Sequence, residues 1–105
     1  MTEADLMRAV TDLATLFHWE WVHFRPAQTS RGWRTPVQGP LGKGWPDLEM
    51  VRERDGGHIY VELKSAAGKL SPEQRAVHSI LGAVHEVYVW RPADLDNGTI
   101  QAVLA

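Results

Sequence analysis

Two acidic residues and a lysine near the middle of the chain have the types and spacing that phosphodiester chemistry requires. Asp47 follows a proline, and Glu62 and Lys64 occupy alternate positions of an apolar segment further on. Because successive side chains of a β-strand point to opposite faces, Glu62 and Lys64 share one face. Gly56-Gly57 can turn the chain back and bring Asp47 beside Glu62. Two carboxylates and an ammonium group at one point would bind a divalent metal ion and a phosphate.

A β-hairpin and a β-α-β crossover are the elements that must position these residues. Alternating apolar residues predict antiparallel strands over 48–52 and 58–64. Ser71-Pro72-Glu73-Gln74 is typical of a helix start, because Ser caps the helix, Pro takes its first position and Gln completes a capping box. The helix is expected over 71–83, and it leads to a strand over 86–90 that runs parallel to the strand 58–64.

The remaining segments complete an α/β fold with a mixed sheet flanked by helices. Apolar residues at helical spacing predict a first helix over 2–17, capped by Thr2 and Asp5. A strand is expected over 19–24, followed by a long connection rich in Gly and Pro over 26–46. Residues 99–104 fit either a short helix or a strand.

Length and composition indicate one small globular domain. The chain has 105 residues, 44% of them hydrophobic, a formal net charge of -2 and no cysteine. It has no apolar run near the roughly 20 residues that span a membrane, and its acidic start lacks the basic region of a signal peptide. We therefore expect a cytoplasmic protein without a membrane anchor. The segment from residue 25 to 45 contains basic residues and no acid, so it fits either a phosphate-binding segment or a solvated loop.

Pro46-Asp47 followed by Glu62-Leu63-Lys64 matches the PD-(D/E)xK pattern of nucleases, and neighbouring residues extend the match. The chain resembles a VRR-NUC domain of the stand-alone type found in phage and bacterial proteins. The resemblance rests on residues 44–48, 62–64, 68–71, 74 and 87–92. It implies a restriction-endonuclease-like core formed by a single domain over residues 1–105, in the cytoplasm of a bacterial or phage-infected cell.

The same resemblance implies an endonuclease that uses Mg²⁺ or Mn²⁺ to cleave DNA, with a preference for structures such as Holliday junctions or flaps. The catalytic residues would be Asp47, Glu62, Lys64 and Gln74. The metal ligands would be Asp47, Glu62, the Leu63 carbonyl group and Glu3. Gln74 fits a capping role equally well, and Glu3 fits an acid favoured at a helix start. Glu49 shares the face of Asp47 on a regular strand, where a surface acid is the commoner role.

DNA contacts are expected from basic residues before and within the long connection. The predicted DNA-binding residues are His23, Arg25, Arg31, Arg34, Lys43 and Lys69. Trp33 and Trp45 fit either base stacking or packing against the domain. The resemblance also predicts Gly at the end of the first helix, where this chain has His18, a residue that adopts positive φ less readily.

Two classes of function remain open: a metal-dependent endonuclease, and a non-catalytic module that binds nucleic acid or a partner with the same fold. The complete set of Asp47, Glu62 and Lys64 favours the enzyme. Selecting a DNA branch requires contacts to at least two arms, so we expect a homodimer. Trp33, Trp45 and the strand 87–90 are the candidates for its interface.

Overall fold

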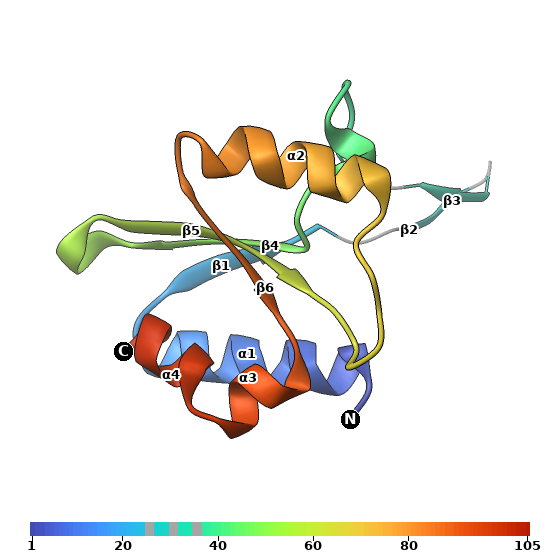
Figure 1. Ribbon diagram of the computed structural model, residues 1–105. Coiled ribbons are helices and arrows are strands. Elements are labelled where there is room, and N and C mark those ends of the chain that lie inside the picture. The colour runs from blue at the N-terminus through green and yellow to red at the C-terminus, as the bar shows by residue number, and fades with distance from the viewer. Residues whose placement is uncertain (25–26, 30–31, 35–36) are drawn as a thin grey trace.

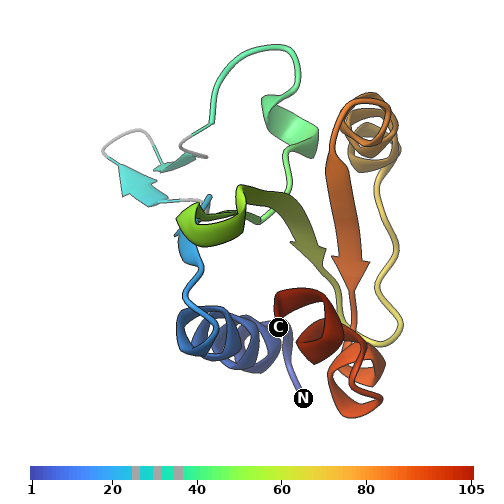
Figure 2. The same cartoon turned by 90° about the vertical axis from the view of Figure 1, so that its left-hand side faces the viewer.

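A four-stranded mixed sheet lies between two layers of helices in the computed structural model, which describes residues 1–24, 27–29, 32–34 and 37–105 (Figure 1). Helix α2 covers one face of the sheet, and α1, α3 and α4 cover the other (Figures 1 and 2). The elements are α1 (Glu3–Leu16), β1 (Glu20–His23), β2 (Ala27–Thr29), β3 (Gly32–Arg34), η1 (Gly42–Gly44), β4 (Leu48–Arg52), η2 (Glu53–Asp55), β5 (Gly57–Leu63), α2 (Pro72–Gly82), β6 (Glu86–Trp90), α3 (Pro92–Asp96) and α4 (Thr99–Leu104).

The sheet has the strand order β1-β4-β5-β6, and its pairing confirms the predicted hairpin and crossover. Strands β4 and β5 are antiparallel with Leu48 opposite Val61, which places residue 47 next to residue 62. Strands β5 and β6 are parallel, and α2 connects them. The register therefore brings the two predicted acids to the same end of the sheet.

The core lies between the sheet and the layer formed by α1 and α4. Alternate residues of β4 and β5 point into it, which is the pattern that their sequences predicted. The other sheet face carries Glu49, Tyr60 and Glu62 toward α2. The buried core residues are Leu6, Val10, Ala14, Trp19, Leu48, Met50, Ile59, Val61, Leu63, Trp90, Ile100 and Leu104.

Capping interactions at the two longest helices are those predicted from sequence. Thr2 Oγ1 accepts from the Asp5 N–H at 3.1 Å while Asp5 Oδ2 accepts from the Thr2 N–H at 3.0 Å. The C-terminal end of α1 is unusual, because His18 has φ 70°, in the left-handed region. The Trp19 N–H donates to the Ala14 carbonyl at 2.8 Å, which closes the helix in the way that glycine normally allows.

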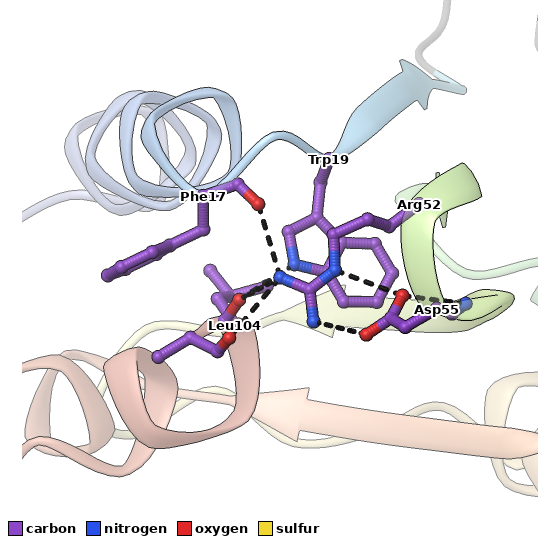
Figure 3. Close-up of polar contacts among 7 residues, drawn as sticks. Phe17, Trp19, Arg52, Asp55 and Leu104 are labelled. Atoms are coloured by element: carbon purple, nitrogen blue, oxygen red, sulfur yellow. Dashed lines mark hydrogen bonds and ion pairs between the residues drawn. The ribbon is translucent and has the colours of Figure 1, made fainter.

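Arg52 is a buried charged side chain that joins three elements at the edge of the core (Figure 3). Its guanidinium group donates to the Leu104 carbonyl at 2.7 Å and to the Phe17 carbonyl at 3.1 Å, and it forms an ion pair with Asp55. It also stacks 4.4 Å from the ring centroid of Trp19. Arg52 therefore binds carbonyl groups at the ends of α1 and α4, and at Leu104 it shares the acceptor with the Trp19 indole N–H, which donates to the same oxygen at 2.9 Å.

The long connection predicted over 26–46 contains secondary structure that the sequence did not predict. It contains the β2–β3 hairpin and η1, and Trp45 after it packs edge-on against Phe24 and Tyr60. Packing, rather than an exposed stacking surface, is therefore the role of Trp45. The segment after β6 forms α3, which was not predicted, and α4, which decides the open choice for residues 99–104 in favour of a helix. None of the helices described is long and apolar enough to cross a membrane.

Candidate active site

A cavity of about 530 Å³ opens at the end of the sheet, between the first turns of α1 and α2. In Figure 1 this is the end where the loop after β5 passes close to the N-terminus. Strand ends supply the floor of the cavity and the two helices supply its sides. The lining residues are Glu3, Ala4, Met7, Arg8, His23, Asp47, Glu62, Leu63, Lys64 and Gln74.

Asp47 and Glu62 lie side by side, as the hairpin register requires. The Leu63 N–H donates to Asp47 Oδ2 at 2.8 Å, and the Phe24 N–H donates to the Asp47 carbonyl at 2.8 Å. Asp47 is therefore held at both its main chain and its carboxylate. The Glu62 side chain is 3% exposed and Asp47 is half-buried, so Glu62 is the more deeply buried of the two acids.

Burial raises the pKa of Glu62 to about 8, and the neighbouring Asp47 carboxylate adds to the effect. Lys64 opposes it, with its Nζ 3.8 Å from Glu62 Oε2. Among the residues that the structure describes, no group donates to Glu62 Oε1, although that atom is buried. An acid in this position binds a proton at neutral pH unless a cation takes the place of the proton.

Gln74 caps α2 and also contacts Glu62 at the cavity, and it does both in one conformation. Its Oε1 accepts from the Ser71 N–H at 2.9 Å, which completes the capping box of α2. Its Nε2 donates to Glu62 Oε2 at 3.2 Å. The first turn of α2 therefore fixes one oxygen of Glu62, and the other, Oε1, is buried without a hydrogen-bond partner among the described residues.

The loop after Lys64 is fixed from the neighbouring strand. The Lys64 N–H donates to the Trp90 carbonyl at 3.0 Å, and the Arg91 guanidinium group donates to the Ser65 carbonyl at 2.7 Å. A second bond from Arg91 reaches the Gly68 carbonyl. These contacts hold the chain between β5 and α2, so Lys64 and Gln74 keep their positions relative to each other.

The donor set fits a hard divalent cation such as Mg²⁺ or Mn²⁺. Two adjacent carboxylates, one with a buried and unsatisfied oxygen, are the ligands that such ions prefer. Leu63 lines the cavity although its side chain belongs to the core, so its main chain forms part of the wall. Within the described residues no three acidic or histidine side chains converge on one point. Asp47 and Glu62 would be the side chains that hold such an ion, and Glu3 lines the cavity without completing a triad.

The other predicted site residues divide into three groups. His23 lines the cavity with the acids, and it makes a contact of its own. Lys43 lies outside the cavity, where its Nζ is 3.2 Å from Glu73 Oε1 with its side chain 81% exposed, and Lys69 is exposed on the loop before α2. Arg25 and Arg31 fall outside the described residues, and Arg34 is described only as part of the β3 backbone.

Helix α1 contributes cavity residues that the sequence analysis did not identify, namely Ala4, Met7 and Arg8. They share a helix face with Glu3, so helical periodicity extended from Glu3 would have identified them. His78, which is not one of the lining residues, has an environment that the sequence did not predict either. It lies one turn after Gln74, its Nε2 is buried without a partner among the described residues, and burial lowers its pKa.

Glu49 takes no part in the cavity. Its Oε2 is 2.6 Å from His58 Nε2, on the face of the sheet that α2 covers. This is the structural role that its position on β4 favoured, and it makes Glu49 a useful comparison for Asp47, two residues earlier on the same face.

The fold and the cavity together define a class: a small α/β domain with a mixed sheet and an acidic site at one sheet end. A scan of protein-family models found no match to this chain. Searches of curated proteins and of solved structures found none either. The resemblance to VRR-NUC domains therefore stays an inference from the motif residues, and function must be inferred from the cavity.

Proposed function

We propose that this protein is a metal-dependent DNA endonuclease with a restriction-endonuclease-like core of the VRR-NUC type. The observation that carries the proposal is the meeting of Asp47, Glu62, Lys64 and Gln74 in one cavity. An exposed ion pair between strands would leave no buried carboxylate without a donor. In this site Glu62 Oε1 is a buried carboxylate oxygen that no described residue donates to. The neighbouring Asp47 adds negative charge instead of compensating the charge of Glu62.

Each residue has a defined part in hydrolysis of a phosphodiester. Asp47 and Glu62, with the Leu63 carbonyl group, would hold the metal ion. Gln74 holds Glu62 in place through its Nε2, and the Leu63 N–H orients Asp47. Lys64 lies beside the ligands, where it can orient the attacking water, accept its proton or stabilise charge on the phosphate. The water oxygen forms a new bond to phosphorus as the bond to the sugar oxygen breaks.

A bound Mg²⁺ or Mn²⁺ ion would polarise the phosphoryl oxygen and lower the pKa of a coordinated water. The protein's own contribution is to bring two carboxylates together at the cost of their mutual repulsion. That arrangement is unfavourable without a cation and becomes favourable with one, which is the behaviour expected of a metal site.

The proposal is tested by incubating the protein with labelled single-stranded, duplex, flap and four-way-junction DNA, with Mg²⁺, with Mn²⁺ or with EDTA. Cleavage is expected only with a divalent metal. Asp47→Asn, Glu62→Gln and Lys64→Met should each reduce it at least about a hundredfold, as loss of a residue that acts in the transition state does. Glu49→Gln is the matched control, because it removes a carboxylate from the same strand face outside the cavity.

Failure to cleave any of the four DNA forms in either metal would overturn the proposal. Equal losses in Glu49→Gln and Asp47→Asn would also contradict it, because they would indicate a general effect of charge rather than a site. Metal-independent DNA binding without cleavage would instead support the non-catalytic module.

We further propose that the active species is a homodimer acting on branched DNA. The domain has a radius of gyration of 13.9 Å, so one copy covers little more than one duplex arm. Of the interface candidates, Trp45 and Trp90 pack within the domain, and the outer strands β1 and β6 carry the free sheet edges. Sedimentation at micromolar concentration tests the state, and a monomer that still prefers four-way junctions to duplex would refute it.

A further inference from the structure

Helix α1 forms one whole side of the acidic cavity, and that side contains a cation. Glu3, Ala4, Met7 and Arg8 line the cavity from α1. Residues one turn apart lie above each other on a helix, so Ala4 and Arg8 form one row and Glu3 and Met7 form the next. Arg8 therefore lies about one turn after Glu3, toward the middle of α1. Gln74 reaches the cavity from α2, on the opposite side.

Arg8 has no carboxylate within ion-pair distance in the part of the chain that the structure describes. The Thr2 N–H, and to a smaller degree Arg8, lower the pKa of Asp5, but Asp5 is already bonded to Thr2 in the capping box. Lys64, in contrast, lies 3.8 Å from a Glu62 oxygen. Of the two basic side chains that line the cavity, Arg8 is thus the one whose guanidinium group makes no ion pair with the described residues.

The charge balance of the cavity indicates a role for the Arg8 guanidinium group. The lining contains three carboxylates, from Glu3, Asp47 and Glu62, against two basic side chains, Arg8 and Lys64. A divalent ion on Asp47 and Glu62 leaves an excess of one positive charge, which matches one phosphodiester. Without Arg8 the loaded cavity would be neutral, and Glu3 would repel the strand from the α1 side.

We propose that Arg8 is a substrate-binding residue that holds a backbone phosphate of the nucleic-acid strand next to the one that is cleaved. This inference rests on the proposed nuclease function and names the contact by which α1 takes part in it. Guanidinium groups bind phosphate oxygens through two parallel hydrogen bonds, so an arginine at this position fixes the strand as well as attracting it. Met7 and Ala4 beside it provide an apolar surface for the sugar.

The test measures binding of fluorescein-labelled oligodeoxythymidine in EDTA, on the Glu62→Gln background, which prevents cleavage. Adding Arg8→Ala should weaken binding roughly tenfold or more, the usual size for loss of a charged hydrogen bond. The slope of log affinity against log salt should become shallower by about 0.7, the value for one phosphate of a single strand. Arg8→Lys should recover the slope but only part of the affinity.

Arg54→Ala is the matched control, because Arg54 is an exposed arginine on η2 that does not line the cavity. It makes the same change in net charge and should alter neither affinity nor slope. Circular dichroism checks the fold of each variant, and Arg8 is an exposed helix residue whose replacement by Ala retains helix propensity.

Equal effects of Arg8→Ala and Arg54→Ala, or an unchanged salt slope in Arg8→Ala, would overturn the inference. If the wild-type protein still cleaves DNA in that case, the proposed function stands and only the role of Arg8 is wrong. If the parent protein binds no DNA and the wild type cleaves none, the proposed function fails and the inference about Arg8 fails with it.

Discussion

Glu62→Gln should make the metal-free protein more stable at pH 8, even though it removes a residue of the candidate site. Burial and the adjacent Asp47 raise the pKa of Glu62 to about 8 from its ordinary value of 4.5. Between these values the folded protein binds a proton that the unfolded chain has lost, so stability falls as pH rises. Glutamine resembles the protonated acid in shape and does not ionise, so the variant lacks this loss.

The two pKa values give the size of the effect. The unfolding free energy falls by up to about 1.4 kcal/mol for each pH unit, and the decrease becomes smaller as the pH approaches 8. From pH 6 to pH 8 the wild-type protein should therefore lose about 2 kcal/mol of unfolding free energy relative to Glu62→Gln. All other ionisable groups are common to both proteins, so their contributions cancel in the difference.

Urea unfolding in EDTA, followed by the fluorescence of the five tryptophans, measures this difference at pH 6, 7 and 8. Glu53→Gln is the control, because it makes the same chemical change at an exposed position on η2 and should follow the wild type. Added Mg²⁺ should stabilise the wild type at pH 8 and leave Glu62→Gln unchanged. Parallel curves for wild type and Glu62→Gln in EDTA would refute the reasoning, because Glu62 would then be ionised without cost.

Three further predictions concern the stability of the elements that surround the cavity, and urea unfolding measures each of them. Arg52→Met should destabilise the protein by about 3 kcal/mol, because the Phe17 and Leu104 carbonyl groups lose a buried donor, and an equal result for exposed Arg54→Met would contradict this. His18→Gly should stabilise it by roughly 0.5–1 kcal/mol, since glycine adopts positive φ without strain, and a loss of stability would show that the His18 side chain is needed. Gly44→Ala should destabilise by roughly 1–3 kcal/mol, because the new methyl group collides with the Glu73 carbonyl of α2, and an unaltered midpoint would mean that α2 moves freely.

The parts of the fold that sequence predicted well are those set by local rules. Both capping boxes depend on residues three positions apart, so Thr2 with Asp5 and Ser71 with Gln74 identified the starts of α1 and α2. The alternation of apolar residues likewise identified β4 and β5, and their connection set the register that pairs Asp47 with Glu62. The floor of the cavity could therefore be predicted.

Other features depend on contacts between distant segments, and there the sequence was less informative. Arg52 interrupts the apolar pattern of β4, and nothing nearby indicates that Leu104 and Trp19 surround it. Arg8 is separated from the motif residues by most of α1 and the first strands, so only helix packing brings it to the cavity. The β2–β3 hairpin consists of three-residue strands within a Gly- and Pro-rich segment, where alternation is too short to detect.

The contacts of Arg52 with Phe17 and Leu104 affect the order in which the protein can fold during translation. Strands β4 and β5 pair across a short turn and can form as soon as both have left the ribosome. Helix α1 is made first, but its apolar residues Leu6 and Val10 pack with Ile100 and Leu104. Until the residues of α4 emerge, α1 can pack only against the sheet, and the Arg52 bond to Leu104 cannot form. The α1 side of the cavity is therefore the last to be fixed, although it is synthesised before every other part of the site.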